Sequence, residues 1–459
     1  MNSIREIRRS TLYAIAALNI TSDPKPIRRL ALQNFCSLLL PMGLVTAAVL
    51  IAFEVRYEKL SHQSSIATTP AQRLDIVSTE AMMLDPSKQL LPAIEPPVLH
   101  AAAQESISDE NVPPPWAMTP PPVPEISTMH SAAPMKPESS RGVFLTTSST
   151  ADNDFLKDTM DRLSAYSNPA LVIDVKGSHV YFRSGAPMAT EMQLVKPLYD
   201  LPSIVDEAHR RGFRIIGRYI ALKDPSLALR KSETQIRHPL KSRSVGNVWV
   251  DGQHATTLQY NREILEDLVQ SGIDEINLDY IRYPTEYAQS DIGLSGSERA
   301  KHVTAFVRMA REVISSSGRD VQLGISTYAI LGWNFPLNFE SVGQDIPELA
   351  DIVDVISPMA YPSTFSIHAY YDPARDKGSR MYHLVKRTLL GYRELVGPEN
   401  VHKLRPWIQG YGVTEKNMND QIQAVFDAEL CGFTVWSASN AYGPTYKAMK
   451  KMTVPERCS

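Results

Sequence analysis

The chain has 459 residues and carries nearly equal numbers of basic and acidic side chains, 47 Lys and Arg against 50 Asp and Glu, for a formal net charge of -3. This balance gives no electrostatic reason to expect nucleic acid as a partner. The average conceals an asymmetry along the chain, because the first 29 residues carry six basic side chains opposed by only two acidic ones.

A segment without any charged residue, 35–53, follows this basic start. At about 1.5 Å per helical residue it can cross a hydrocarbon core of roughly 30 Å. It has no polar face, unlike a buried helix of a soluble domain, and no clean small-residue cleavage site follows it, unlike a cleaved signal peptide. We therefore predict a cytoplasmic tail (1–34) and a single transmembrane signal anchor in the inner membrane (35–53). The rest of the chain would then lie in the periplasm or outside the cell.

The region 54–140 is rich in Pro, Ser and Ala and lacks the apolar periodicity of a folded core. Thirteen of the 33 prolines of the chain fall between residues 86 and 137. Such a composition predicts a disordered, extended linker that holds the folded part away from the membrane. A proline-rich ligand for another protein, as in an assembly or scaffold protein, is the less favoured alternative.

From residue 141 onward, short apolar runs alternate with amphipathic helical stretches, as in parallel strands that are buried on both faces. The predicted strands are 142–146, 170–175, 213–221, 275–281, 321–327, 353–359, 404–409 and 432–437, and the predicted helices are 152–165, 201–211, 260–271, 296–317, 380–396 and 415–430. This alternation predicts a (β/α)8 TIM barrel over 141–452, followed by a short tail (453–459), with an open doubly wound sheet as the alternative. No GxGxxG or GxxxxGK[ST] loop follows the first strands, so no nucleotide is expected.

The cysteines and histidines give no pattern for a metal site. HxH, HExxH and CxxC spacings are all absent, so we expect neither a bound transition metal nor another cofactor. Of the three cysteines, Cys36 falls in the predicted membrane segment. Cys431 and Cys458 can form one disulfide in an oxidising compartment, but the sequence equally allows a buried free thiol at Cys431.

The segment EINLDYIRYP (275–284) reads as a buried strand that carries Asp279 to its carboxyl end. Counting by twos places Asn277 and Asp279 on one face of the strand. The carboxyl ends of the strands are where a barrel of parallel strands collects its chemistry. We therefore predict catalysis or ligand binding for Asp279, over the alternative of a structural ion pair with Arg282.

Other strand ends supply further polar and aromatic side chains. We predict that Asp174 and Lys176 lie on one face of the second strand, and that the same rim holds Asn277, Arg282, Tyr361, Trp407, Gln409, Trp436 and Asn440. Sugar rings lie against aromatic faces, and their hydroxyls bond to amide, carboxylate and basic groups. The set therefore predicts a binding site for a polysaccharide or oligosaccharide, although each aromatic taken singly can equally be packing.

These strand-end motifs resemble those of a known family, the bacterial putative glycoside hydrolase domain. The resembling pieces, in family order over 141–450, are VIDVKG, ALKDP, GIDEINLDYIRYP, ISPMAYPS, RPWIQGY, DQI (420–422) and GFTVWSASNAY. The resemblance implies a (β/α)8 barrel distantly similar to the alpha-amylase-like enzymes, with Asp279 at the position proposed for the nucleophile. The chain departs from the family at the end of strand five, where Ser326 and Thr327 stand in place of a frequent acidic residue.

Hydrolysis of a glycosidic bond ordinarily uses two carboxyl groups. Asp279 is the predicted nucleophile or stabiliser, and Arg282 or Lys176 is expected to keep it ionised. Asp174, Glu286 and Asp372 are the candidate proton donors, of which Asp174 is the best placed. The sequence thus predicts a membrane-anchored glycoside hydrolase acting on an extracytoplasmic polysaccharide. The missing carboxylate of strand five motivates the alternative of a catalytically inactive carbohydrate-binding barrel.

Overall fold

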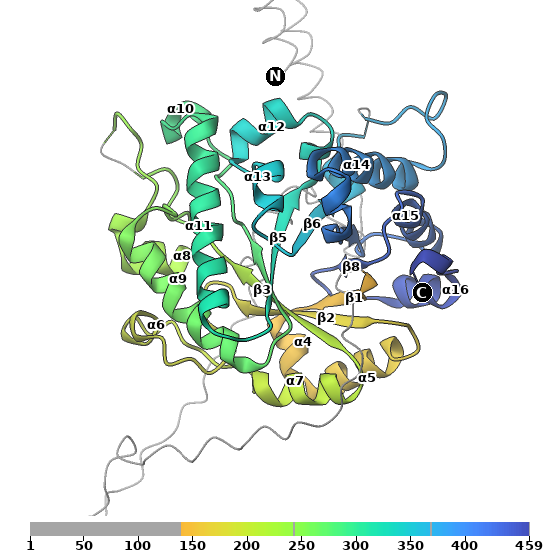
Figure 1. Cartoon of the computed structure of the whole chain (residues 1–459), viewed down its shortest axis with the longest axis horizontal. Coiled ribbons are helices and arrows are strands. Elements are labelled where there is room, and N and C mark those ends of the chain that lie inside the picture. Colours follow the sequence, from red (N-terminus) through yellow and green to blue (C-terminus); the bar gives the residue numbers. More distant parts are fainter. Residues whose placement is uncertain (1–138, 242–243, 368–369, 459) are drawn as a thin grey trace, which may run out of the picture. The chain divides into compact units, whose positions relative to one another are not determined.

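The computed structural model describes residues 139–241, 244–367 and 370–458. Its eight parallel strands pair in sequence order and the first pairs with the last, which closes the barrel (Figure 1). The strands are β1 (Arg141–Leu145), β2 (Pro169–Lys176), β3 (Arg214–Ile220), β4 (Glu275–Asp279), β5 (Gln322–Tyr328), β6 (Val355–Ala360), β7 (Trp407–Gln409) and β8 (Phe433–Trp436). The predicted barrel is confirmed, and the open sheet is excluded.

Helices surround the strands (Figure 1). They are α4 (Thr147–Ala151), α5 (Asn153–Leu163), α6 (Pro187–Glu191), α7 (Leu201–Arg210), α8 (Pro225–Arg230), α9 (Ala255–Leu268), α10 (Gln289–Ile292), α11 (Gly296–Ser316), α12 (Phe335–Val342), α13 (Ile346–Ala350), α14 (Arg380–Val396), α15 (Glu415–Asp427) and α16 (Gly443–Lys451). The 3-10 helices are η4 (Ser232–Thr234), η5 (Val269–Ser271), η6 (Ala329–Gly332), η7 (Pro362–Thr364), η8 (Pro398–Lys403) and η9 (Glu456–Cys458). The six predicted helices are confirmed, as α5, α7, α9, α11, α14 and α15. The remaining α-helices, of four to nine residues, were not predicted because such short segments show too little of the helical period.

Strand β7 is shorter than predicted, beginning at Trp407 instead of residue 404. Pro406, which precedes it, has no N–H to donate to a neighbouring strand, so regular hydrogen bonding between the strands begins only after it. Leu404 nevertheless makes an isolated parallel bridge to Ile356 of β6. The side chains of β7 therefore sit in the expected order, but only its last three residues form regular strand.

The apolar residues form two layers on either side of the strands. The larger layer fills the space between the strands and the helices. The smaller one fills the barrel interior and consists of Phe144, Ala170, Val172, Ile216, Tyr361 and Trp407. The interior of this barrel is thus packed with side chains, as in other barrels of this size, and its free surfaces are at the ends.

A buried ion cluster closes the amino-terminal end of the barrel interior. Glu275 of β4 accepts from both terminal nitrogens of Arg405, at 2.8 and 2.6 Å, and Nη2 of Arg214 lies 3.4 Å from the same carboxylate. The Glu275 side chain is fully buried and that of Arg405 nearly so. Since the first residues of β3 and β4 and the residues before β7 meet here, the cluster lies opposite the strand ends that carry Asp279.

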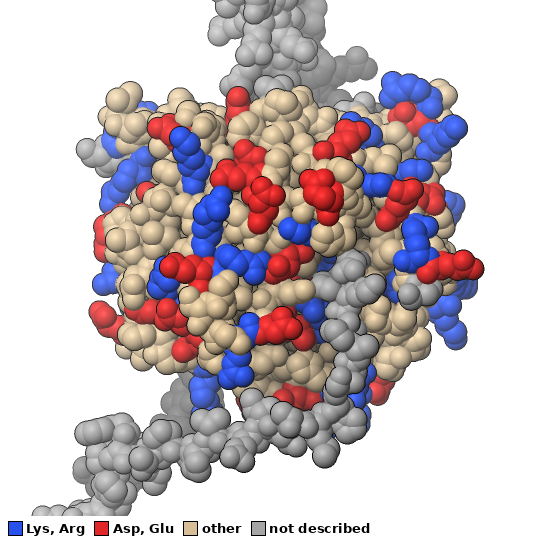
Figure 2. All heavy atoms as spheres, in the orientation of Figure 1, with Lys and Arg blue, Asp and Glu red and all other residues tan. Residues whose placement is uncertain are grey.

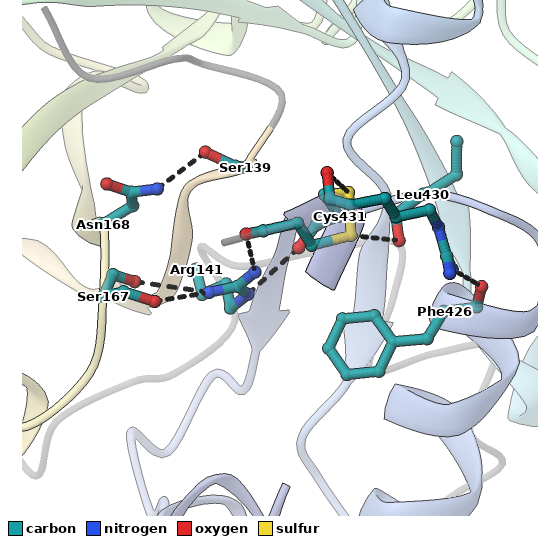
Figure 3. The surroundings of a disulfide bond; sticks show 9 residues. Ser139, Arg141, Ser167, Asn168, Phe426, Leu430 and Cys431 are labelled. Atoms are coloured by element: carbon teal, nitrogen blue, oxygen red, sulfur yellow. Dashed lines mark hydrogen bonds between the residues drawn. A yellow bond between two sulfur atoms is a disulfide. The ribbon is translucent and has the colours of Figure 1, made fainter. Parts of the chain in front are cut away.

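A disulfide between Cys431 and Cys458 joins the loop before β8 to η9 (Figure 3). Arg141, the first residue of β1, donates to the backbone oxygens of both cysteines, at 3.0 and 3.2 Å, and to the hydroxyl of Ser167 at 2.9 Å. The sequence left open whether these cysteines pair, and the structure pairs them. The first strand and the last segment of the chain are thereby fastened together.

The predicted tail (1–34), the predicted membrane span (35–53) and the linker up to residue 138 lie outside the described residues. Within the described part of the chain, no helix combines the length and the apolar character that crossing a bilayer requires. Ser139 and Ser140, the last two residues of the predicted linker, are buried, and Asn168 donates to the Ser139 hydroxyl at 2.7 Å. The folded domain therefore includes both serines.

Candidate active site

Asp279 is the last residue of β4 and lies at the carboxyl-terminal mouth of the barrel. Tyr280, which follows it, has a left-handed backbone with a φ of 53°, a conformation that bulky side chains rarely adopt. This turn lets the backbone N–H of Tyr280 donate to Oδ1 of Asp279 at 2.7 Å. The Asp279 side chain keeps 10% of its surface exposed. The carboxylate is therefore held in place by its own strand end and retains an accessible edge.

Arg218 of β3 bridges Asp279 to a second carboxylate, Asp174 of β2. Its Nε and Nη2 contact Oδ2 of Asp279 at 2.8 and 2.7 Å, and its Nη1 contacts Oδ1 of Asp174 at 2.7 Å. The strand register explains the meeting, because Asp174 pairs with Arg218 and Ile220 pairs with Asp279. The guanidinium also lies 5.4 Å from the centre of the Phe144 ring of β1. Three neighbouring strands thus converge on one site.

Burial and charge act on Asp174 and on Arg218 in this bridge. Burial raises the pKa of Asp174, although the nearby positive charge of Arg218 opposes this shift. Burial of Arg218 favours its neutral form, but the negative charges of Asp174 and Asp279 outweigh burial and raise the pKa of Arg218. Asp279 receives two of the three guanidinium contacts. Asp174, whose pKa is raised, suits the role of the acid. Asp279, which receives two contacts from Arg218, suits the role of the nucleophile.

Aromatic rings form one wall of the mouth. Trp436, at the end of β8 and only half-buried, has its ring centre 6.3 Å from Phe144, 5.9 Å from Tyr361 and 5.3 Å from Tyr411. Gln409 of β7 lies beside them, accepting from the backbone N–H of Ser363 and donating to the backbone oxygen of Tyr411, both at 3.0 Å. The structure thus brings Asp174, Asp279, Tyr361, Gln409 and Trp436 to one mouth.

Two predicted binding residues lie deeper in the barrel. The indole N–H of Trp407 donates to the Ser326 hydroxyl at 2.9 Å, and that hydroxyl donates to Asn277 Oδ1 at 2.7 Å. Asn277 is fully buried and Trp407 nearly so. Both side chains face the interior, as the alternation predicted, but one layer below Asp279. They support the floor of the site, and their own polar groups are satisfied by protein.

Lys176 does not lie at the mouth of the barrel, where it was predicted. The strand register shifts between Asp174 and Lys176, so that Lys176 pairs with Tyr219 and faces the helix layer instead of the mouth. Its ammonium is fully buried and lies 2.8 Å from both Asp224 and the backbone oxygen of Ile220. Counting by twos placed Lys176 beside Asp174, and one irregular residue moved it to the other face.

Arg282 and Asn440 also have partners away from the two carboxylates. The guanidinium of Arg282 lies between the rings of Trp249 and Tyr328, at 4.7 and 4.5 Å from their centres, and does not pair with Asp279. Asn440 donates to the backbone oxygen of Phe144 at 3.0 Å and accepts from the backbone N–H of Thr146 at 2.9 Å. Asn440 therefore fastens the end of β1 to the loop after β8.

The other two candidate proton donors stand apart from Arg218. Glu286 is exposed in the loop after β4, with Lys223 Nζ 3.9 Å from its carboxylate. Asp372 is exposed in the loop after β6, where it accepts from the backbone N–H of Ala374 at 2.9 Å. Of the three candidates, Asp174 alone contacts the guanidinium that also holds Asp279. Among the described residues, no group of three or more His, Cys, Asp or Glu could hold a metal ion.

Arg218 was not among the predicted site residues, although the sequence carries a signal for it. RIIGRYI places Arg218 in the middle of an apolar run that was itself predicted as a buried strand. A guanidinium inside a core strand needs carboxylate partners, because an unpaired buried charge is costly. The carboxylates at the ends of the two neighbouring strands were the available partners.

Comparisons with known proteins bear on the site. The family described as "Putative glycosyl hydrolase domain" has a model that matches residues 142–442. A comparison with curated protein sequences finds no match. Among solved structures, a hypothetical protein from Ruminiclostridium thermocellum is 26% identical over 40% of this chain and 96% of its own, with a TM-score of 0.35.

Two enzymes of known structure are also similar in chain trace. The spore cortex-lytic enzyme SleL of Bacillus cereus is 10% identical over 70% of this chain and 76% of its own, with a TM-score of 0.44. A beta-galactosidase from Marinomonas ef1 is 10% identical over 68% of this chain and 58% of its own, with a TM-score of 0.49. The family model, by contrast, spans well over half of the chain and includes the strands of both paired carboxylates. The chain therefore belongs to the putative glycosyl hydrolase domain family.

Proposed function

We propose that this glycoside hydrolase domain cleaves a polysaccharide outside the cytoplasm, with Asp174 and Asp279 as its two catalytic carboxyl groups. The observation that carries the proposal is the bridge of Asp174, Arg218 and Asp279 at the mouth of the barrel. Two carboxyl groups flanking the scissile bond are what most glycoside hydrolases use. The half-buried Trp436 beside them supplies an aromatic surface for a sugar ring.

Asp279 takes the role of the ionised carboxylate. Arg218 and the Tyr280 N–H each donate a hydrogen bond to one of its two oxygens and hold the carboxylate in position. A carboxylate held in this way can attack the anomeric carbon or stabilise the positive charge that develops on the ring as the glycosidic bond breaks. The left-handed turn at Tyr280 fixes the carboxylate before substrate arrives, so no reorganisation is needed during the reaction.

Asp174 takes the role of the proton donor. Its raised pKa keeps more of it protonated near neutral pH than an ordinary aspartic acid. In the first step its proton passes to the glycosidic oxygen as the bond from that oxygen to the anomeric carbon breaks. Water then supplies the hydroxyl of the new sugar end and returns a proton to Asp174.

The proton-donor role predicts an alkaline limb in the pH profile. Because Asp174 must be protonated, kcat/KM should fall as pH rises through the raised pKa of this carboxyl. Asp174→Asn should remove that limb and lower the rate on a natural glycan by about 10²- to 10⁴-fold. The rate of Asp174→Asn on an aryl glycoside with an acidic phenol should fall far less, because that leaving group departs without a proton. Initial rates measured across pH on both substrates test this.

Two matched variants serve as controls for Asp174. Glu286→Gln and Asp372→Asn remove the other candidate proton donors from exposed loops. Both should keep the alkaline limb and the wild-type rate on the glycan. If either one removes the limb while Asp174→Asn keeps it, the proton donor is that residue and the assignment of Asp174 is wrong.

The disulfide supports a location outside the cytoplasm, because disulfides persist in oxidising surroundings and are rare in the cytosol. The predicted signal anchor (35–53) and the proline-rich linker would place the barrel on the outer side of the inner membrane. We expect the chain to stay with the membranes after washing in high salt. After denaturation, a maleimide tag should label one cysteine, Cys36, without reductant and three with it. Recovery of the chain in the soluble cytosolic fraction with three reactive thiols would contradict this placement.

A carbohydrate-binding barrel without turnover is the second candidate. Two observations favour it. Both oxygens of Asp279 already have hydrogen-bond partners within the protein. The end of β5 carries the hydroxyl residues Ser326 and Thr327 in place of a carboxylate. A reducing-sugar assay on a panel of envelope and capsule glycans, run beside a binding assay, distinguishes the two functions. Binding without product, unchanged by Asp279→Asn, would establish the binding module and remove the hydrolase.

A further inference from the structure

A second aromatic cluster lies on the loops that follow β5 and β6. Trp333 comes directly after η6, and its ring centre is 5.3 Å from Phe365 and 5.2 Å from Tyr370, which belong to the loop after β6. Phe365 and Tyr370 are 5.3 Å apart, so the three rings contact one another mutually. Loops after barrel strands lie at the carboxyl-terminal face, and this cluster therefore shares a face with Asp279.

The outermost ring of this cluster faces solvent. Tyr370 is 44% exposed, and Ile367 of the same loop is 76% exposed. Tyr370 also has a left-handed backbone, with a φ of 66°, which is rare for a bulky residue and concentrates at binding sites. The ring of Tyr370 is therefore held by its two aromatic neighbours and is still partly open to solvent.

The cluster has a firm base. The indole N–H of Trp333 donates to the Thr388 hydroxyl of α14 at 2.9 Å. The Arg387 guanidinium lies 5.2 Å from the centre of the same indole and donates to the backbone oxygen of Gly332 at 3.0 Å. The exposed ring of Tyr370 therefore rests on side chains that helix α14 and η6 hold in position, which lowers the ordering cost of binding a ligand there.

The loop after β6 connects the cluster to the mouth of the barrel. The Ser363 hydroxyl of η7 lies 2.7 Å from the phenol oxygen of Tyr411, whose ring contacts Trp436. Phe365, in the cluster, comes four positions after Tyr361, at the mouth, and that length of chain spans at most about 14 Å. The two aromatic surfaces therefore lie within a few sugar units of each other.

We propose that Tyr370, supported by Trp333 and Phe365, is a second sugar-binding platform that holds a distant part of a long polysaccharide while its scissile bond lies at the mouth. The apolar face of a pyranose ring fits an exposed aromatic ring, and a polymer can reach both surfaces at once. This inference rests on the proposed function only for the class of ligand. It adds that the substrate is a polymer longer than the mouth itself holds.

The test measures polymer binding without requiring turnover. The full chain carrying Asp279→Asn is run through native gels that contain soluble starch, carboxymethylcellulose, glycol chitin or dextran. Tyr370→Ala and Tyr370→Leu remove the aromatic face, whereas Tyr370→Phe keeps it. Leu229→Ala, which removes a 79% exposed apolar side chain from α8, is the matched surface control.

We expect at least one polymer to slow the migration of the Asp279→Asn chain, which is the parent of the other variants. Both Tyr370→Ala and Tyr370→Leu should weaken that binding by about 3- to 10-fold. Tyr370→Phe and Leu229→Ala should bind like the parent. With Asp279 restored, Tyr370→Ala should hydrolyse a short aryl glycoside at the wild-type rate. Equal binding by Tyr370→Ala and Tyr370→Phe, or no retardation by any of the four polymers, would overturn the platform. Polymer binding that depends on Tyr370 in a chain without hydrolysis would keep the platform and reject the hydrolase.

Discussion

Replacing Asp279 with Asn should lower kcat by about 10⁴-fold or more, because the reaction loses its ionised carboxylate and not only a binding contact. Asn keeps the shape of the side chain, but its single oxygen can accept either from Arg218 or from the backbone N–H of Tyr280, because these two donors bond to different oxygens of Asp279. Arg218 keeps its contact with Asp174, so the melting temperature should fall only modestly and the fold should remain. Reducing-sugar release from a cleaved glycan, with thermal unfolding measured on the same samples, tests both parts.

Asp372→Asn is the matched control for this variant, since it makes the same chemical change in an exposed loop of the same face. It should leave kcat unchanged. Full glycan cleavage by Asp279→Asn would show that another group acts as the carboxylate. A large loss of melting temperature in Asp279→Asn would show instead that its partnership with Arg218 is structural.

Replacing Glu275 with Ala should destabilise the barrel by about 3–5 kcal/mol, because it leaves buried positive charge without its partner. Arg405 and Arg214 both face this carboxylate, and all three side chains are nearly or fully buried. The free energy of unfolding in urea measures the effect. Asp158→Asn, which breaks an exposed ion pair with Arg162 on α5, is the matched control and should have far less effect.

The same ion cluster predicts how stability depends on acid. Burial alone would raise the pKa of Glu275, but the contacts with Arg405 and then Arg214 outweigh it, so this pKa is lowered. A lowered folded-state pKa gives stability that is present above the unfolded-state pKa of about 4.3 and is lost as pH falls through the folded-state pKa. The wild-type advantage over Glu275→Ala should therefore shrink in acid below that value. An advantage that grows on acidification would contradict the assigned charge state.

The barrel and the strand that carries Asp279 were both predictable from the amino-acid pattern. Eight apolar runs that alternate with amphipathic helices leave few other ways to bury both faces of every strand. Strand β4 ends at Asp279, as predicted, and Asn277 shares the interior face with it. These features were predictable because they depend on local composition and on the two-residue period of one strand.

Which charged side chains meet depends on how distant strands pair in the folded barrel. Asp174 and Asp279 are joined by Arg218, a residue of the strand between theirs, because the register places Asp174 level with Arg218 and places Asp279 one layer further along the barrel axis, within reach of the long Arg218 side chain. A single irregular residue turned Lys176 away to Asp224, and stacking between rings drew Arg282 away from Asp279. Depth also separated Trp407 from Trp436, although both lie on the interior face. Pairing register, bulges and depth along the barrel axis arise from contacts between distant segments, and the pattern of one segment does not contain them.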